Sequence, residues 1–220
     1  MPLTTLKTKP GGYGSPLPED KDTRTRLLDL GQHLFQTRGY NAFSYRDLGA
    51  KIGIRNASIH HHFPTKEALG LAIVTRYQEW FLNWSRIKAG LTPPEQVEAF
   101  FRMYGRFVRD EEKLCPVGML ETDFHTLPQA LQQATQQLVR TIREWLTEVL
   151  AQGRNAGRFH YATTAEGAAR MMAAALVGAL ALSRSEGTEL LDGTCEELRR
   201  FLGMSPTPGA EQRGDTPAAT

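Results

Sequence analysis

Apolar residues recur every three or four positions through most of the chain, and this spacing predicts amphipathic helices. The alternation of apolar and polar residues that is typical of half-buried strands is nearly absent, and no Asn-Gly turn separates two apolar segments. The sequence therefore predicts an all-α chain of about nine helices. The expected helices cover about residues 23–38, 44–52, 56–62, 65–87, 92–107, 117–125, 127–155, 163–185 and 194–202.

Capping sequences mark several of the predicted helix starts. In Ser44-x-x-Asp47 the two side chains can each satisfy a free backbone N–H of the first turn. Thr92-Pro93-Pro94-Glu95 combines a capping threonine, a proline at the first helical position and a glutamate three residues on. We interpret Thr163-x-x-Glu166 as the same signal for the helix rich in alanine, leucine and methionine.

Composition separates the two ends of the chain from the residues between them. Residues 1–21 are expected to form a flexible arm, because the first twenty contain four prolines and three glycines without an apolar period. Residues 203–220 have the same character and are expected to form a disordered tail. The residues between these two ends carry the helical periods.

Residues 44–62 have the size and spacing of a helix-turn-helix, with Gly53 permitting a tight turn and Ile54 packing between the helices. In such a motif the N-terminal residues of the second helix face the bases of the major groove. Here these residues would be Arg55, Asn56, Ala57 and Ser58, which offer contacts to guanine, adenine and the thymine methyl group. A plain helical hairpin within a bundle has the same pattern, so both interpretations stay open at this point.

The net charge of +2 is unevenly distributed. Through Lys66 there are ten Lys and Arg residues against five Asp and Glu residues, an excess of +5. The remainder holds 16 basic and 19 acidic residues, a balance of −3. A basic first third suggests that it meets a polyanion, although solvated surfaces carry similar excesses.

One string of residues extends through this basic part in register and without gaps. It is Leu34-Phe35-x-x-x-Gly39-Tyr40-x-x-x-Ser44-x-x-Asp47-Leu48-Gly49-x-x-Ile52-Gly53-Ile54, followed by Ser58-Ile59-His60-x-His62-Phe63-Pro64-x-Lys66-Glu67-x-Leu69. The string resembles the DNA-binding domain of the TetR family of transcriptional repressors, over about residues 23–70. The resemblance implies a three-helix DNA-binding domain at 22–68, an effector-binding and dimerisation domain at 69–202, and release of DNA when a small molecule binds.

The resemblance also implies specific DNA contacts. Ser44 would touch phosphate, residues 55–58 would face the groove, and Lys66 would grip phosphate, helped by the N-terminal dipole of its helix. His60 stands where the family usually has a tyrosine that contacts the DNA backbone, and a histidine there can add a pH-sensitive charge. Ala57 replaces a common glycine. The expected DNA-binding residues are Ser44, Arg55, Asn56, Ala57, Ser58, His60, His61 and Lys66.

The run of three histidines at 60–62 does not predict a metal site. Successive side chains on a helix diverge by about 100°, so three adjacent histidines cannot converge on one ion. We expect His62 to pack inward beside Phe63 and no metal or other cofactor to be bound.

The aromatic and apolar positions of residues 69–202 either line a pocket or fill a core, and the sequence leaves both open. Their apolar majority predicts a hydrophobic or aromatic effector, oriented by polar groups such as Glu121, Asp123, His125 and Arg170. The candidate ligand-binding residues are Trp84, Phe101, Tyr104, Met119, Phe124, Trp145 and Met172.

Cys115 is a candidate redox or electrophile sensor. It precedes Pro116 near a predicted helix start, where the helix dipole lowers the pKa of a thiol, and Lys113 would act in the same direction. The alternative is a half-buried cysteine that caps the helix.

The last two helices resemble the dimerising pair of the family. Ala173, Leu176, Val177, Leu180 and Ala181 form a face of small and medium side chains suited to close helix packing. A partner copy would complete a four-helix interface, and a two-fold dimer predicts a palindromic operator.

The expected function is a ligand-responsive transcriptional repressor. A DNA-binding architectural or division-control protein without an effector is the alternative. We expect no enzyme, because the chain has no Gly-rich phosphate loop, Gly-x-Ser-x-Gly elbow or His-Glu-x-x-His pair. A cytoplasmic, membrane-free location is expected, because no secretory signal is evident and the longest apolar stretch, Met171 to Leu182, is shorter than the roughly 20 residues of a membrane span.

Overall fold

The structure, a computed structural model, describes residues 22–109 and 114–204. Within these ranges the regular structure is helical, as predicted. The predicted N-terminal arm and all but the first two residues of the predicted tail lie outside the described residues. The elements are α1 (Thr23–Arg38), α2 (Tyr45–Ile52), α3 (Asn56–His62), α4 (Lys66–Lys88), α5 (Pro93–Arg109), α6 (Pro116–Asp123), a 3-10 turn η1 (Phe124–Thr126), α7 (Gln129–Asn155), α8 (Ala165–Glu186) and α9 (Glu189–Phe201).

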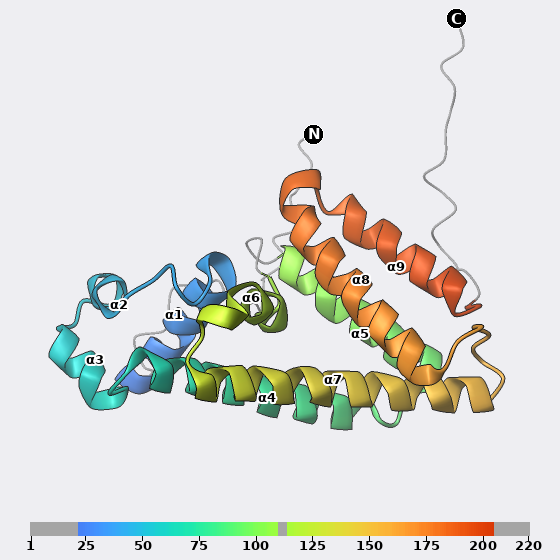
Figure 1. Cartoon of the computed structure of the whole chain (residues 1–220), viewed down its shortest axis with the longest axis horizontal. Coiled ribbons are helices and arrows are strands. Elements are labelled where there is room, and N and C mark those ends of the chain that lie inside the picture. The colour runs from blue at the N-terminus through green and yellow to red at the C-terminus, as the bar shows by residue number, and fades with distance from the viewer. Residues whose placement is uncertain (1–21, 110–113, 205–220) are drawn as a thin grey trace, which may run out of the picture.

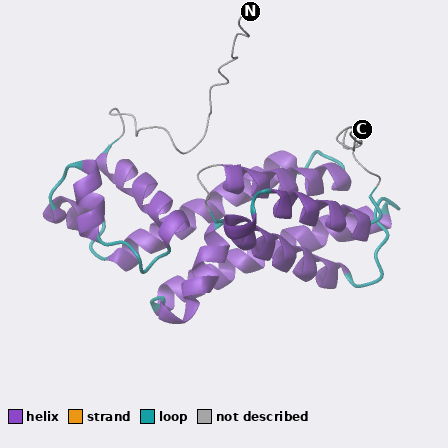
Figure 2. Ribbon diagram, turned by 90° about the horizontal axis from the view of Figure 1, so that it is seen from above, coloured by secondary structure: helices purple, strands orange, loops and turns teal. Residues whose placement is uncertain are grey.

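Helices α1 to α3 form a head at one end of the molecule, and helices α4 to α9 form a larger body (Figures 1 and 2). The two long helices α4 and α7 pack along each other within the body, and α4 also packs on α1. Helices α8 and α9 form a hairpin that packs on α7 and α5. Helix α6 contacts α1, α7 and α8, so it lies where the head meets the body.

The head is held in shape by local signals that the sequence carries. Ser44 and Asp47 form the predicted capping box at the start of α2. The Ser44 hydroxyl and the Ser44 backbone N–H each donate to Asp47 Oδ2 at 2.7 Å, and these two bonds lower the pKa of the Asp47 carboxyl. Gly53 ends α2 with φ +79°, a left-handed conformation that favours glycine. A Cβ on Gly49 would lie 2.8 Å from the Ile54 carbonyl oxygen, so the α2–α3 turn needs glycine at both positions.

Three helix starts differ from the sequence prediction by two residues or more. Helix α7 begins at Gln129, two residues after the expected start at 127. Helix α8 is capped by Thr164, whose Oγ1 accepts from the Gly167 N–H at 3.0 Å, and not by Thr163. Helix α9 begins at Glu189, five residues before the expected start at 194. Its early turns are held by burial of Leu191, while Gly193 faces open space and disturbs no packing. Burial of a large side chain outweighs the weak helix propensity of one glycine.

Helix α8 is apolar on more than one side. Among the described residues it is the one helix long and apolar enough to span a membrane by length and composition, with mean hydropathy 1.4 over its best window, a third of which is buried. Its packing on α5, α7 and α9 accounts for the buried part. Met171 and Leu182 stay 46% and 51% exposed, so a second apolar face is uncovered in the single chain.

Candidate DNA interface and effector core

Helix α3 presents a free polar face at the end of the head. Ile59 is fully buried and Phe63 is 2% exposed, and these two side chains anchor the helix on the head. Arg55, Asn56 and Ala57 are exposed at its N-terminus. Within the described part of the chain the Arg55 side chain makes no capping bond and no ion pair. The structure therefore places the predicted base-contacting residues on an accessible helix end, with Ser58 half-buried beside them.

Ser44 and Lys66 both make contacts with other residues of the head. The Ser44 hydroxyl donates its one proton to Asp47 Oδ2 at 2.7 Å. The Lys66 ammonium lies 4.7 Å from the ring centres of both Tyr40 and Phe43, and burial lowers its pKa while nearby carboxylates raise it. A phosphate contact by either side chain stays a prediction, and each would have to compete with these internal contacts.

The histidine run divides as expected by exposure: His60 and His61 are exposed and His62 is half-buried. The His60 ring packs edge-on against Tyr45, with 4.9 Å between ring centres, and its Nδ1 lies 3.0 Å from the Pro64 carbonyl oxygen. The Tyr45 hydroxyl donates to the carbonyls of Phe63 and Thr65, at 2.8 and 2.5 Å. His60 thus braces the α3–α4 turn, and Nε2 is the nitrogen that faces away from this contact.

Helix α6 connects the body to the head through backbone groups. Asp123 Oδ2 accepts from the N–H groups of Tyr40 at 2.8 Å and Asn41 at 3.4 Å. Asn41 in turn donates to the Thr126 hydroxyl at 2.7 Å. A Cβ on Gly39 would lie 3.0 Å from the same carboxylate oxygen, so glycine permits this close approach. Asp123 was expected to orient a ligand, but the structure uses it to join the end of α6 to the α1–α2 turn.

A second contact joins α1 to the segment that enters α6. The backbone N–H of Leu114 donates to the Gln36 carbonyl at 3.2 Å, and the Gln36 side chain donates to the Leu114 carbonyl at 3.2 Å. Gln36 is 5% exposed, so its amide is satisfied inside the protein. Sequence analysis missed this pair because a glutamine on a helix carries no signal of a partner nearly eighty residues away.

An aromatic cluster fills the centre of the body. Trp84 and Trp145 lie 5.2 Å apart between ring centres, and Phe100 lies 5.2 Å from both Trp145 and Tyr104. Phe81 contacts both tryptophans at 5.7 Å. The structure thus brings together three of the seven candidate ligand-binding residues: Trp84, Tyr104 and Trp145.

Three of the other four candidates have contacts outside this cluster. Phe101 is covered by the Arg199 guanidinium, 5.2 Å from its ring centre, and faces α9. Met119 approaches Gly39 at the contact between α6 and the head. Phe124 lies in η1 against His125, and Met172 is fully buried on α8. The sequence could not separate these positions because helical spacing shows which residues are apolar but not which neighbouring helix each one meets.

Cys115 is the N-cap of α6, where its Sγ accepts from the Gly118 N–H at 3.3 Å. The side chain is 2% exposed, and burial raises its pKa to about 11 despite bonds from backbone N–H groups and the Tyr104 hydroxyl. The expectation of a lowered thiol pKa is therefore wrong: loss of solvation outweighs the helix dipole. Lys113, the other expected cause, lies outside the described residues. The capping interpretation fits the geometry.

The predicted dimer face is also partly wrong. Leu176 and Leu180 are 0% and 2% exposed because they pack into the body of their own chain. The uncovered face of α8 is turned from the predicted one and carries Met171, Ala174, Ala181 and Leu182. Of the predicted five residues, Ala181 alone is exposed in the single chain.

Comparison with known proteins agrees with this architecture. Residues 27–73 match the family described as bacterial regulatory proteins, tetR family, and residues 93–194 match the tetracyclin repressor-like C-terminal domain. The HTH-type transcriptional repressor KstR2 of Rhodococcus jostii is 44% identical over 46 residues, 21% of this chain and 22% of that protein. The repressor DhaR of a Mycobacterium species is 24% identical over 127 residues, 56% of this chain and 61% of that protein. These matches thus span about a fifth to three fifths of the curated relatives.

Solved structures match over more of the chain. A TetR-family regulator from Agrobacterium tumefaciens superposes with a TM-score of 0.77 at 28% identity, covering 81% of this chain and 96% of that one. A TetR regulator from Legionella pneumophila gives a TM-score of 0.74 at 29% identity, covering 84% and 99%. The head with its helix-turn-helix, the helical body and both family matches lead to one conclusion: the chain belongs to the TetR family of transcriptional regulators.

Proposed function

We propose that this DNA-binding regulator is a repressor that binds a palindromic operator as a homodimer and is released by a small hydrophobic or aromatic effector. The observation that carries the proposal is the free N-terminal end of α3, where Arg55, Asn56 and Ala57 are exposed. These side chains suit guanine, adenine and the thymine methyl group. Curated relatives that are named as repressors support repression over activation.

The uncovered face of α8 supports the dimer. Met171, Ala174, Ala181 and Leu182 recur at helical spacing, and small residues among them allow two helices to approach closely. An isologous dimer through this face would cover the apolar surface that the single chain leaves in water. With its apolar face covered by a partner copy, α8 would not need a membrane, and this agrees with a cytoplasmic location.

The aromatic cluster supports the effector class. Trp84, Trp145 and Tyr104 offer faces and edges on which an aromatic ring could stack, and Tyr104 carries a buried hydroxyl. The hydroxyl of the same tyrosine lies close enough to Cys115, at the start of α6, to lower the pKa of that thiol. A ligand that displaces these side chains would therefore act on the helix that holds the head through Asp123.

Selection of bound fragments from genomic DNA tests the operator part of the proposal. We expect the full chain to enrich a palindrome and to give one dimer per site in sedimentation. The genes beside the enriched site would indicate which aromatic compounds to test. We expect DNA to be released when the right compound is titrated into the complex. A monomer at micromolar concentration would contradict the dimer. Operator binding unchanged by any such compound would favour a DNA-binding protein without an effector.

A further inference from the structure

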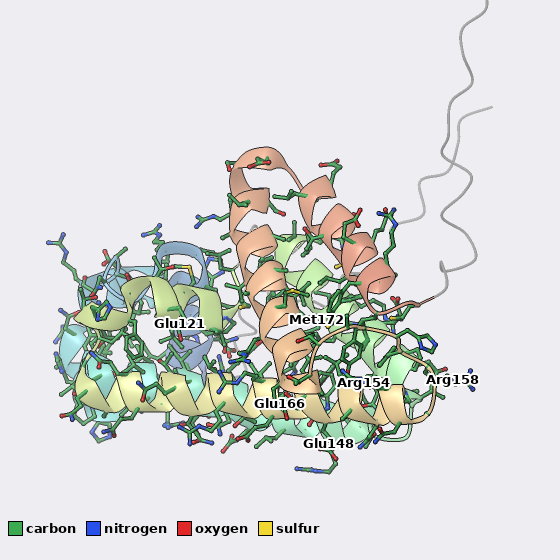
Figure 3. The ribbon with its side chains drawn as sticks, turned by 45° about the vertical axis from the view of Figure 1, so that its right-hand side comes forward. Glu121, Glu148, Arg154, Arg158, Glu166 and Met172 are labelled. Atoms are coloured by element: carbon green, nitrogen blue, oxygen red, sulfur yellow. The ribbon has the colours of Figure 1, made fainter. Side chains whose placement is uncertain are left out.

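A groove of about 670 Å³ lies between α7 and α8. It is lined by Arg143, Glu144, Thr147, Glu148, Ala151, Glu166 and Arg170. In Figure 3, Glu166 lies where α8 meets α7, while Glu121 lies on α6 beside the head. This α7–α8 groove plays no part in the DNA interface.

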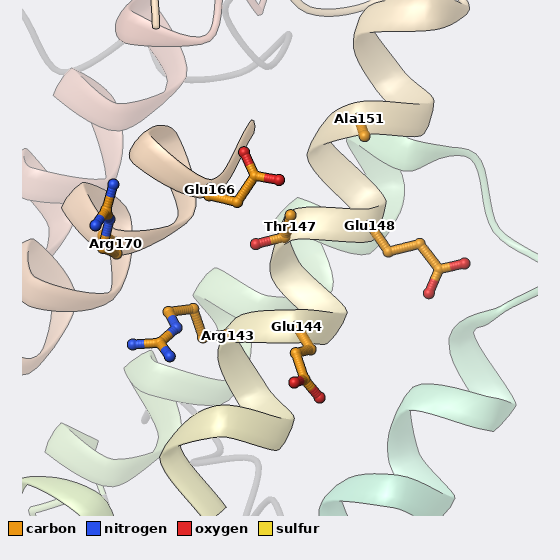
Figure 4. Close-up of a pocket in the computed structure, with 7 residues that line it drawn as sticks. All are labelled: Arg143, Glu144, Thr147, Glu148, Ala151, Glu166 and Arg170. Carbon is orange, nitrogen blue, oxygen red and sulfur yellow. The ribbon is translucent and has the colours of Figure 1, made fainter. Parts of the chain in front are cut away.

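Two of the residues that line the groove are arginines without an ion-pair partner in the described part of the chain, although three glutamates also line it. Figure 4 shows the Arg143 side chain extending from α7 toward the side of the groove where Arg170 stands on α8. In the described ranges neither guanidinium has a hydrogen bond or ion pair, unlike Arg76 and Arg199, which bind carboxylates at 2.6 Å. Two cations that share one groove repel each other, so a bridging anion would lower the free energy of this arrangement.

The carboxylates nearby do not fill that role. Glu144 and Glu148 extend to the opposite side of α7 from the two arginines (Figure 4). Glu166 lies one turn before Arg170, an order that favours a helical ion pair, yet the two side chains form none. On the arginine side of the groove the balance is therefore two positive charges against one negative charge.

Thr147 adds a hydrogen-bond donor. Thr141, on the same helix, donates its hydroxyl to the Gln137 carbonyl at 3.0 Å. The half-buried Thr147 makes no such bond to any described residue, so its hydroxyl is available to a ligand. The groove also borders the first two turns of α8, whose N-terminal dipole favours negative charge.

We propose that the α7–α8 groove binds the oxyanion group of a soluble small molecule, a carboxylate or a phosphate, through Arg143, Arg170 and Thr147. Guanidinium groups match both oxyanions because their paired N–H donors fit two oxygens at once. No residue of the aromatic cluster is among the lining residues of this groove, so its ligand is a second effector or the charged end of a long one. The proposal does not depend on which DNA the protein binds.

Calorimetric titration of the full chain with pyrophosphate and with succinate, at constant ionic strength set by chloride, tests the site. We expect one saturable site per chain for at least one of the two anions. Saturation by pyrophosphate alone identifies a phosphate ligand, and saturation by succinate alone identifies a carboxylate. Arg143→Gln and Arg170→Gln are each expected to weaken the binding by roughly tenfold, the loss typical of one charge-assisted contact. Both side chains are exposed, and thermal melting would verify that the variants fold.

Two further variants separate a built site from general attraction to a basic surface. Glu166→Gln removes the opposing charge and should tighten anion binding severalfold. Arg140→Gln removes an exposed charge on the same helix outside the groove and should leave the affinity unchanged. No saturable heat with either anion would overturn the proposal. So would an equal loss in Arg140→Gln and Arg143→Gln, because attraction would then follow net charge alone.

Discussion

Arg55 and Lys66 are both basic residues of the head, but their surroundings differ. Arg55 is exposed at the start of α3, whereas Lys66 is half-buried over the Tyr40 and Phe43 rings. Arg55→Ala should therefore leave the fold intact and relax base preference at one operator position, at a cost of about 1–3 kcal/mol in specific binding. Lys66→Ala should weaken binding to all sequences alike and also lower the melting temperature. Parallel titrations of operator and random DNA check this, and equal effects of the two variants would contradict the assignment.

The buried thiols predict a dependence of stability on alkaline pH. Burial raises the pKa of Cys115 to about 11, and that of Cys195 on α9 to about 11, from an ordinary value of 9.0. The unfolded chain then loses these protons at lower pH than the folded chain. The contribution is fully present below about pH 9 and is lost as pH rises toward 11. Urea unfolding from pH 7 to 10.5 should show this decline.

A matched variant isolates the thiols from other alkaline titrations. The pKa values of buried Tyr77 and Tyr104 are also raised by burial, so they act in the same direction. Replacing both cysteines by alanine should make the unfolding free energy fall less steeply over this range. An unchanged slope would show that neither thiol is the cause. Iodoacetamide at neutral pH should likewise leave Cys115 of the folded chain unmodified, because the side chain is 2% exposed.

At the scale of the element, the α2–α3 turn depends on close backbone contact. A Cβ at Gly49 would lie 2.8 Å from the Ile54 carbonyl oxygen, and a backbone atom cannot move aside without shifting α3. Gly49→Ala should destabilise the protein by about 1–3 kcal/mol, as overpacking typically does, and reduce operator affinity. Gly193→Ala is the control, because Gly193 lies in α9 with open space around it and alanine favours helix there. Thermal melting should show opposite shifts for the two variants.

Elements were predictable from sequence where the signal is local. Apolar spacing and the Ser44–Asp47 capping box were enough to place α1 to α4 within a residue or two. Thr163 and Thr164 are both acceptable caps, and only backbone geometry selects the second. The uncovered face of α8 was misplaced because α5, α7 and α9 decide which side is buried, and those contacts are long-range. The partner of Asp123 was missed for the same reason.

At the scale of the whole molecule, α6 is one of the body helices that contact the head, as α4 also is. Its start, Cys115, lies next to Tyr104 of the aromatic cluster, and its end, Asp123, holds the turn before α2. The contact of Gln36 with Leu114 adds a second tie to α1. A movement of α6 would therefore act on both α1 and the α1–α2 turn, and α3 follows directly after α2. The proposed effector response needs this continuity and no change in α3 itself.

The Asp123 contact can be tested without knowing the effector. Asp123→Ala removes the acceptor of the Tyr40 and Asn41 N–H groups, which should destabilise the folded chain by roughly 1–3 kcal/mol, the cost typical of losing bonds to a charged group. Glu121→Ala is the matched control, because Glu121 is an exposed residue of the same helix. Hydrogen exchange should speed up at Tyr40 and Asn41 in the first variant and stay unchanged in the second. If protection at these two amides survives loss of the carboxylate, α6 does not hold the head through Asp123, and effector signals must cross elsewhere. Intact operator binding by Asp123→Ala would show that the contact is not needed to build the DNA interface.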